Sequence, residues 1–187
     1  MKRIHLSLLF GGALAMVQPA NADLYTASMS GVNEVPPNTS TATGFTSVTV
    51  EGDTLAVHVD WAGLTGGNAT AAHIHCCSDP GANAGIAVGL PSFPAATSGT
   101  YENTFDLSAP STYSDDFLND VGGGSAEGAA AALIAALNAT RAYSNIHNAD
   151  FPGGEIRGNL APIPLPPAVM LFTTALLGLL PLARRSR

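Results

Sequence analysis

A strict two-residue alternation between residues 44 and 61 constrains the fold more than any other feature of the sequence. Apolar residues occupy every second position from Leu55 to Trp61, and Glu51-Gly52-Asp53 separates this arm from a preceding arm with the same alternation. Successive side chains of a β-strand point to opposite faces, so this pattern buries one face and exposes the other. The segment is predicted to be a β-hairpin, with His58 and Asp60 on its solvated face.

Further short strands are predicted along the chain, separated by clusters of Gly, Pro and Asn. One helix is predicted at residues 126–138, with Ser125 as its N-cap, and a shorter one within residues 113–121. Many short antiparallel strands with few helices are typical of an all-β sandwich or barrel, and we predict a single antiparallel β-sandwich. The other strand candidates are residues 24–29, 71–75, 99–107, 142–147 and 155–160. The core is predicted to contain Leu55, Val57, Val59, Trp61, Ile74, Phe105, Ile146, Ile156 and Leu160.

The N-terminus has the three parts of a secretory signal peptide. Lys2-Arg3 precedes an apolar run from Leu6 to Val17, and Ala20-Asn21-Ala22 supplies the small residues that signal peptidase accepts. The apolar run is too short for a spanning helix. We therefore expect residues 1–22 to be removed by cleavage between Ala22 and Asp23.

The C-terminal residues 162–187 form a second three-part signal. The stretch from Pro162 to Pro167 reads PIPLPP, residues 168–183 are apolar or small and are expected to form a helix, and residues 184–187 read RRSR. The arginines would stay in the cytoplasm and hold the domain outside. This tail resembles the PEP-CTERM sorting signal of Gram-negative bacteria, although no Glu follows the first proline. The resemblance implies an exosortase-type processing protease and transient anchoring in the inner membrane; a permanent single-span anchor is the alternative.

The domain between the two signals, residues 23–161, is strongly acidic. It contains all fourteen acidic residues of the chain but only two of the seven basic ones, Arg141 and Arg157. Such a charge repels polyanions, so we expect no nucleic-acid partner. The charge does not exclude divalent cations, basic partners or neutral glycans as ligands. Arg157 is expected to pair with a carboxylate in a structural role.

Two short motifs carry a family resemblance. Residues 72–77 read AHIHCC, and Asn145-Ile146-His147 precedes FPGGEIRG at residues 151–158. In this order and spacing, with Glu34-Val35-Pro36-Pro37 near the start, they resemble the CHRD domain, which was first named from chordin and is widespread in exported bacterial proteins. The resemblance implies an immunoglobulin-like or superoxide-dismutase-like sandwich without an agreed catalytic activity. The Cys pair departs from the family's commonest form, in which Gly-Pro follows HIH.

Three histidines are candidate metal ligands. His73 and His75 share one face of a strand, about 7 Å apart at ~3.3 Å per residue, and His147 ends another strand. Both strands end at turns and carry their histidines at the same pleat parity, so we expect them to be neighbours with the histidines converging. Imidazoles completed by Glu155 or by the Cys76 sulfur would suit Zn²⁺ or Cu²⁺. The alternative is that these histidines hydrogen-bond the backbone and organise loops.

Cys76 and Cys77 are adjacent in a chain that we expect in an oxidising compartment. Three outcomes are open: a vicinal disulfide, pairing with another chain, or thiolate ligation of a metal beside His75. We favour the vicinal disulfide, as a clip at the end of the HIH strand.

Two functions from different classes remain. The first is an exported, non-catalytic module of the periplasm, cell surface or exopolysaccharide matrix, with a candidate metal site. The second is a copper- or zinc-dependent enzyme with a superoxide-dismutase-like site. A bridged dinuclear centre of that kind needs more imidazoles than the four of the mature chain. Because no nucleophile–base motif and no phosphate-binding loop is present either, the first function is preferred.

Overall fold

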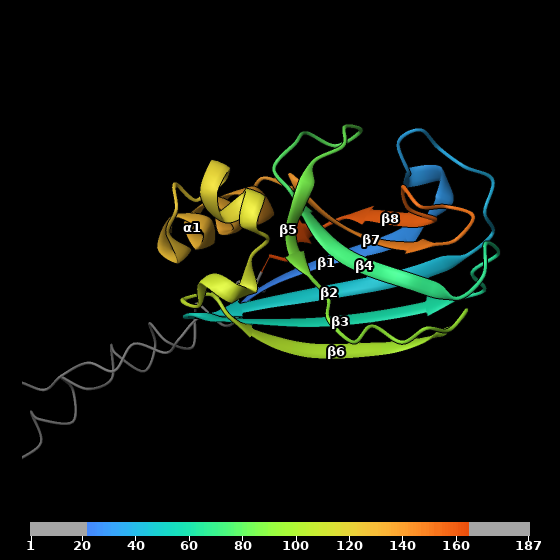
Figure 1. Ribbon diagram of the computed structural model, residues 1–187, viewed down its shortest axis with the longest axis horizontal. Helices are drawn as coiled ribbons and strands as arrows, with labels where there is room; N and C mark the ends of the chain where they lie inside the picture. Colours follow the sequence, from blue (N-terminus) through green and yellow to red (C-terminus); the bar gives the residue numbers. More distant parts are fainter. Residues whose placement is uncertain (1–21, 165–187) are drawn as a thin grey trace, which may run out of the picture.

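The computed structural model describes residues 22–164, which form one antiparallel sheet of nine strands (Figure 1). The spatial order is β5-β4-β7-β8-β1-β2-β3-β6, and β9 pairs with β1 beside this path. The sheet curls into a half-barrel in which β4, β5 and β7 lie over β2, β3 and β6. The strands are β1 (Asp23–Ser30), β2 (Thr43–Glu51), β3 (Thr54–Ala62), β4 (Ala69–Cys76), β5 (Gly85–Gly89), β6 (Gly99–Asp106), β7 (Ala142–Asn148), β8 (Ile156–Asn159) and β9 (Ala161–Pro162).

The antiparallel, mostly β architecture is confirmed, but the continuous curled sheet differs from the predicted sandwich of two sheets. Strand β1 explains the difference. It pairs with β2 along its full length, whereas on its other side it pairs with β8 only at Ser30 and Arg157 and with β9 at Tyr25 and Thr26. The sheet therefore turns at β1 without separating into two halves. Alternation of apolar residues is compatible with either arrangement, because it specifies one buried face for each strand.

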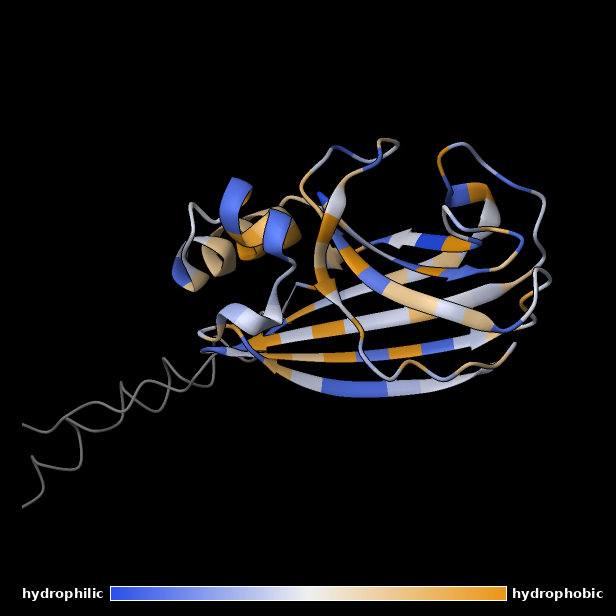
Figure 2. Cartoon of the chain, viewed as in Figure 1, coloured by the Kyte–Doolittle hydropathy of each residue, from blue (hydrophilic) through white to orange (hydrophobic). Residues whose placement is uncertain are grey.

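The core lies on the concave side of the curled sheet. The structure confirms which residues of the predicted hairpin face this core and which face outward. Residues Leu55, Val57, Val59 and Trp61 of β3 are all buried, while His58 and Asp60 face outward. Figure 2 shows apolar residues alternating with polar ones along β2 and β3. The residues Ile74, Ile146, Ile156 and Leu160 are fully buried, as predicted. Phe105 is only partly buried, because its strand, β6, forms one edge of the sheet.

Helix α1 (Ala126–Asn138) has the predicted bounds and lies at one end of the curled sheet (Figure 1). The Ser125 side chain accepts a hydrogen bond from the backbone N–H of Gly128, so it caps the helix as expected. Within the predicted second helix, residues 113–121, residues 115–121 are helical, and most of this stretch is the π-helical segment η3 (Phe117–Val121). Two 3₁₀ segments, η1 (Gly31–Asn33) and η2 (Pro110–Thr112), complete the helical elements of the described chain.

Strand β5 was not predicted from the sequence. Its five residues, GIAVG, are bounded by glycines and carry no alternation, so no periodic signal marks them. The predicted signal peptide and the apolar run of the tail lie outside the described residues. Between residues 22 and 164, no helix is long and apolar enough to cross a membrane.

Candidate metal centre

The pairing of β4 with β7 places three histidines on one face of the sheet. His73 lies opposite Asn145, His75 lies opposite Tyr143, and His147 lies opposite Ala71. Directly opposed residues of an antiparallel pair share a face. The histidines therefore lie on the outer face of β4 and β7, and their neighbours in the chain, Ile74 and Ile146, face the core.

The three imidazoles are close enough to bind one metal ion. One nitrogen from each of His73, His75 and His147 can be chosen so that all three lie within 4.8 Å of one another. His73 Nδ1 and His147 Nε2 are 3.0 Å apart. Because imidazole nitrogens bind Zn²⁺ at about 2.0–2.1 Å, ligands of a single ion lie roughly 3–4 Å apart. Small side-chain rotations would bring this cluster to that spacing.

Backbone carbonyls determine which nitrogen of two of the histidines carries the proton. His75 Nδ1 lies 2.9 Å from the carbonyl oxygen of Ala84, and His147 Nδ1 lies 3.0 Å from that of Pro152. A carbonyl can only accept, so each Nδ1 carries the proton and each Nε2 keeps its lone pair. His75 Nε2 is buried and has no hydrogen-bond partner. Histidines that bind metals are typically held in this way, by a hydrogen bond from the nitrogen that does not bind the metal.

The surroundings keep all three imidazoles neutral. Burial lowers the pKa of each, and at His73 the neighbouring His147 and His75 lower it further, to about 4. Hydrogen bonds to Ala84 and Pro152 oppose the effect of burial at His75 and His147 without reversing it. At neutral pH the cluster therefore presents uncharged nitrogens, which is the form that binds a metal ion.

Tyr143 supports the His75 ring from β7. The two rings stack with centroids 4.7 Å apart and an angle of 3° between their planes. The guanidinium carbon of Arg157 lies 4.1 Å from the centroid of the Tyr143 ring. The Tyr143 hydroxyl also accepts a hydrogen bond from the backbone N–H of Ala84, the residue whose carbonyl orients His75. Packing and hydrogen bonding thus fix the orientation of His75.

Arg157 pairs with a carboxylate, as predicted, and the partner is Glu34. Arg157 Nε lies 3.5 Å from Glu34 Oε2, and the two side chains are 2% and 5% exposed. The guanidinium also donates hydrogen bonds to the carbonyls of Asn33 and Ala82 and to Asn83 Oδ1. It therefore connects β8 to two loops, residues 31–38 and 77–84.

Burial raises the pKa of Glu34 to about 7, although Arg157 and a hydrogen bond from the Val35 backbone lower it. A carboxyl with a raised pKa holds a proton in the folded protein that the unfolded chain releases. Its stabilising contribution is complete below the unfolded value of 4.5 and is lost as pH rises through about 7. We expect the free energy of unfolding to fall by up to about 3 kcal/mol across this window.

The Glu34→Gln variant, which cannot titrate, should lose this part of the pH dependence. Urea unfolding of the wild type and the variant between pH 4.5 and 8 measures the difference. Glu51→Gln, at an exposed position, serves as the control. Parallel stability profiles for wild type and Glu34→Gln would show that Glu34 stays ionised beside Arg157.

The structure does not bring Glu155, a predicted ligand, to the histidines. Its carboxylate is fully buried and accepts hydrogen bonds from Ser40 Oγ, from the N–H and hydroxyl of Thr65, from Gly66 N–H and from Asn148 Nδ2. These hydrogen bonds outweigh burial and lower the pKa of Glu155. Because Glu155 precedes β8 in a turn, strand parity does not determine its direction. It connects loops and binds none of the histidines.

Cys76, the other predicted completing ligand, lies on the opposite side of β4 from His75. Alternation along the strand directs its side chain into the core, and its sulfur is bonded to that of Cys77. In this arrangement no thiolate is available to the histidine cluster. The sulfur of Cys77 lies 4.0 Å from the carbonyl oxygen of Ala132, so the disulfide lies against helix α1.

Strand parity predicts Tyr143 and Asn145 on the same face as His147, and the pairing of β4 with β7 agrees. Sequence reasoning did not foresee the supporting roles of these two residues, nor those of Ala84 and Pro152. The carbonyls of Ala84 and Pro152 belong to loops and have no side-chain signal. The turn before β8 also needs glycine at Gly154, where φ is +126° and a Cβ atom would lie 2.5 Å from Glu34 Oε1. Gly153, the preceding residue of the same turn, does not have a positive φ.

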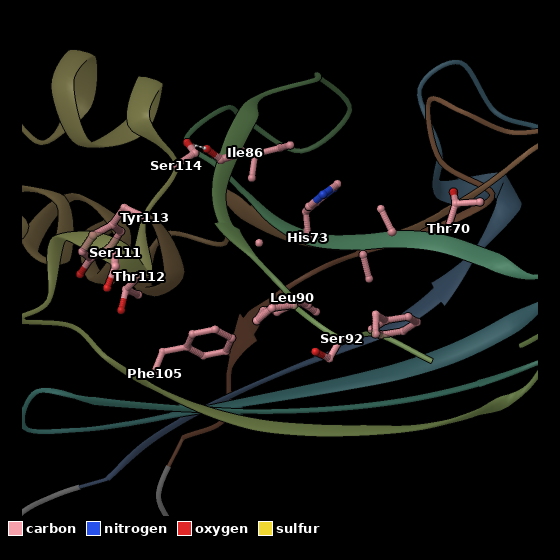
Figure 3. Close-up of a pocket in the computed structure, with 15 residues that line it drawn as sticks. Thr70, His73, Ile86, Leu90, Ser92, Phe105, Ser111, Thr112, Tyr113 and Ser114 are labelled. Atoms are coloured by element: carbon pink, nitrogen blue, oxygen red, sulfur yellow. Dashed lines mark hydrogen bonds between the residues drawn. The ribbon is translucent and has the colours of Figure 1, made fainter. Parts of the chain in front are cut away.

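A groove of about 620 Å³ lies beside the cluster (Figure 3). It is lined by residues of β4 and β5, the chain that follows β5, Phe105 of β6 and residues 111–114. His73 and Tyr113 are its only titratable residues, and burial raises the pKa of Tyr113 to about 12. The Tyr113 hydroxyl donates a hydrogen bond to the carbonyl of Leu107. The groove thus holds no pair of groups arranged for acid–base or nucleophilic catalysis.

Comparison with known proteins gives one family match. The CHRD domain model matches residues 25–160. This range includes the three histidines, the Arg157–Glu34 pair and the loops that orient them. No match to the chain was found among curated proteins or among solved structures.

Proposed function

The chain belongs to the CHRD domain family, and we propose that it is an exported, non-catalytic member that binds one Zn²⁺ or Cu²⁺ ion through His73, His75 and His147. The convergence of three neutral imidazole nitrogens supports this proposal most directly. Two of the three rings are already oriented by backbone carbonyls. Imidazole is a suitable ligand for both metals.

The competing explanation, that these histidines organise loops, accounts for only part of the geometry. The hydrogen bonds to Ala84 and Pro152 use one nitrogen of His75 and one of His147, and the second nitrogen of His147 is hydrogen-bonded to His73 Nδ1. They leave the buried Nε2 of His75 without a partner. An unpaired buried polar atom costs free energy, and a bound metal would remove that cost. Loop organisation and metal binding are therefore complementary roles of the same residues.

The enzyme alternative has little support. His58, the fourth histidine of the predicted mature chain, lies in β3 between Asp60 and Glu102, with its ring nitrogens 2.8 and 3.1 Å from their carboxylates. It does not join the cluster, which therefore offers ligands for a single ion. Binding of one metal ion in the cell envelope, without catalysis, fits this arrangement better than the chemistry of a bridged dinuclear centre.

Export and sorting form the second part of the proposal and are supported by the sequence of the two termini. The signal peptide would bring the domain into the periplasm. The C-terminal tail would hold it transiently at the inner membrane until an exosortase-type protease acts. The domain would then remain at the cell surface or in the exopolysaccharide matrix, where it encounters extracellular metal ions.

The test is metal titration of the chain expressed with both terminal signals and purified from the cell envelope. Intact-mass analysis should place the mature N-terminus at Asp23, and calorimetry should show one equivalent of Zn²⁺ or Cu²⁺. The His75→Ala and His147→Ala variants should each bind at least about 100-fold more weakly, because they remove a direct ligand.

His58→Ala is the matched control, since it removes an imidazole outside the cluster, and its affinity should equal that of the wild type. If the wild-type protein binds neither ion, or if all three variants bind as the wild type does, the metal proposal is wrong. An N-terminus that retains residues 1–22 would contradict the export proposal separately.

A further inference from the structure

Asn145 lies beneath the point where the three histidine rings converge. It is directly opposite His73 across the β4–β7 pair, diagonal to His75, and two residues before His147 on the same face. His75 and Ala71, the residue opposite His147, are four residues apart along β4, yet the ring centroids of His75 and His147 are only 6.1 Å apart. The outer two rings therefore lean toward the central position, which the Asn145–His73 pair occupies.

The two ends of the Asn145 amide have different surroundings. The side chain is 2% exposed. Its Nδ2 faces the backbone of the turn before β8: it lies 3.5 Å from the carbonyl oxygen of Gly153, and a Cβ atom on Gly154 would be 2.7 Å from it. The other end, Oδ1, is buried and has no hydrogen-bond partner. The acceptor end is therefore the free end of the amide.

Two unpaired buried atoms of this face, Asn145 Oδ1 and His75 Nε2, call for a common explanation. His75 Nδ1 donates to the Ala84 carbonyl and the Asn145 Nδ2 lies toward the Gly153 carbonyl, so in this arrangement the two remaining atoms both offer lone pairs and do not satisfy each other. A metal ion satisfies both atoms at once.

We infer that the amide oxygen of Asn145 is the fourth ligand of the site, which gives the ion three imidazole nitrogens and one oxygen. This inference rests on the proposed metal-binding function and makes it more specific. An amide oxygen is a hard donor, and the described cluster has no thiolate or thioether, so the site favours the divalent ions Zn²⁺ and Cu²⁺ over Cu⁺. The oxygen also closes the coordination sphere on the side of the sheet.

Replacement of Asn145 by aspartate tests the inference, because it places a charged oxygen where the amide oxygen lies. The Asn145→Asp variant should bind Zn²⁺ at least tenfold more tightly than the wild type. Asn119→Asp, at an exposed position of η3, adds the same charge away from the site and is the control. Its affinity should stay within twofold of the wild type. Affinity is measured by competition with a chromophoric chelator.

A second measurement needs no substitution and so does not depend on the variant folding. In wild-type protein labelled with ¹³C at asparagine, one equivalent of Zn²⁺ should shift the side-chain carbonyl resonance of Asn145 more than that of any other asparagine. If Zn²⁺ binds and this resonance stays in place, or if folded Asn145→Asp binds no more tightly, Asn145 is not a ligand and the three-histidine site stands without it. A wild-type protein that binds no ion would overturn both proposals.

Discussion

Replacing Glu155 by glutamine should lower the free energy of unfolding by about 2–4 kcal/mol, because buried donors that now share a carboxylate would be left without an acceptor. The carboxylate is fully buried and accepts hydrogen bonds from Ser40, Thr65, Gly66 and Asn148. A glutamine would present one N–H₂ group to donors that need an acceptor. Urea unfolding at neutral pH measures the loss.

The Glu51→Gln variant is the control for this comparison, because it makes the same chemical change at an exposed position and should alter stability by less than about 0.5 kcal/mol. Folded Glu155→Gln protein should still bind metal with nearly wild-type affinity, since Glu155 contacts none of the histidines. A stability loss below 1 kcal/mol would show that the network tolerates a neutral side chain. A large loss of metal affinity would indicate that Glu155 is a metal ligand.

The Arg157→Lys substitution should reduce stability by about 2–4 kcal/mol while retaining the positive charge. The planar guanidinium donates to Asn33, Ala82 and Asn83 together, from a position that is 2% exposed. A lysine has one ammonium nitrogen and cannot donate to all three of these acceptors at once. The loop of residues 77–84 would loosen, and because it carries the carbonyl that orients His75, metal affinity should fall by roughly tenfold.

Arg141→Lys provides the matched control. Arg141 forms an exposed ion pair with Asp79, with its Nε 2.9 Å from the Asp79 carboxylate. Exposed pairs contribute little, so this variant should unfold within about 0.5 kcal/mol of the wild type. Thermal and urea unfolding of the two variants give the comparison. Equal stability of both would mean that charge at position 157 matters and hydrogen-bond geometry does not.

Strand parity explains why much of the site could be predicted from the sequence. The alternation that buries Val57 and Val59 is local information, and the same reasoning placed Ile74 and Ile146 inward and the histidines outward. Helix α1 carried its own start signal in Ser125. These predictions hold because each depends on a residue's position within its own strand or helix.

The remaining features depend on contacts between distant segments. The direction of Glu155 is set by the loops of Ser40 and Thr65, and the partner of Arg157 lies more than a hundred residues earlier in the chain. The curl of the sheet depends on how β1 pairs on its second side. Strand β5 has too little pattern to be recognised. None of these contacts produces a periodic pattern in the sequence from which it could be predicted.

The pairing of β4 with β7 has a consequence for how such a domain can vary. Odd-numbered residues of both strands, from 71 to 75 and from 143 to 147, face outward toward the loops, and the even-numbered residues 72, 74, 144 and 146 face the core. Substitutions that change the chemistry of the outer surface and substitutions that change the core therefore fall at separate, alternating positions. The outer set can diversify between descendants of one ancestor while the inner set preserves the common fold.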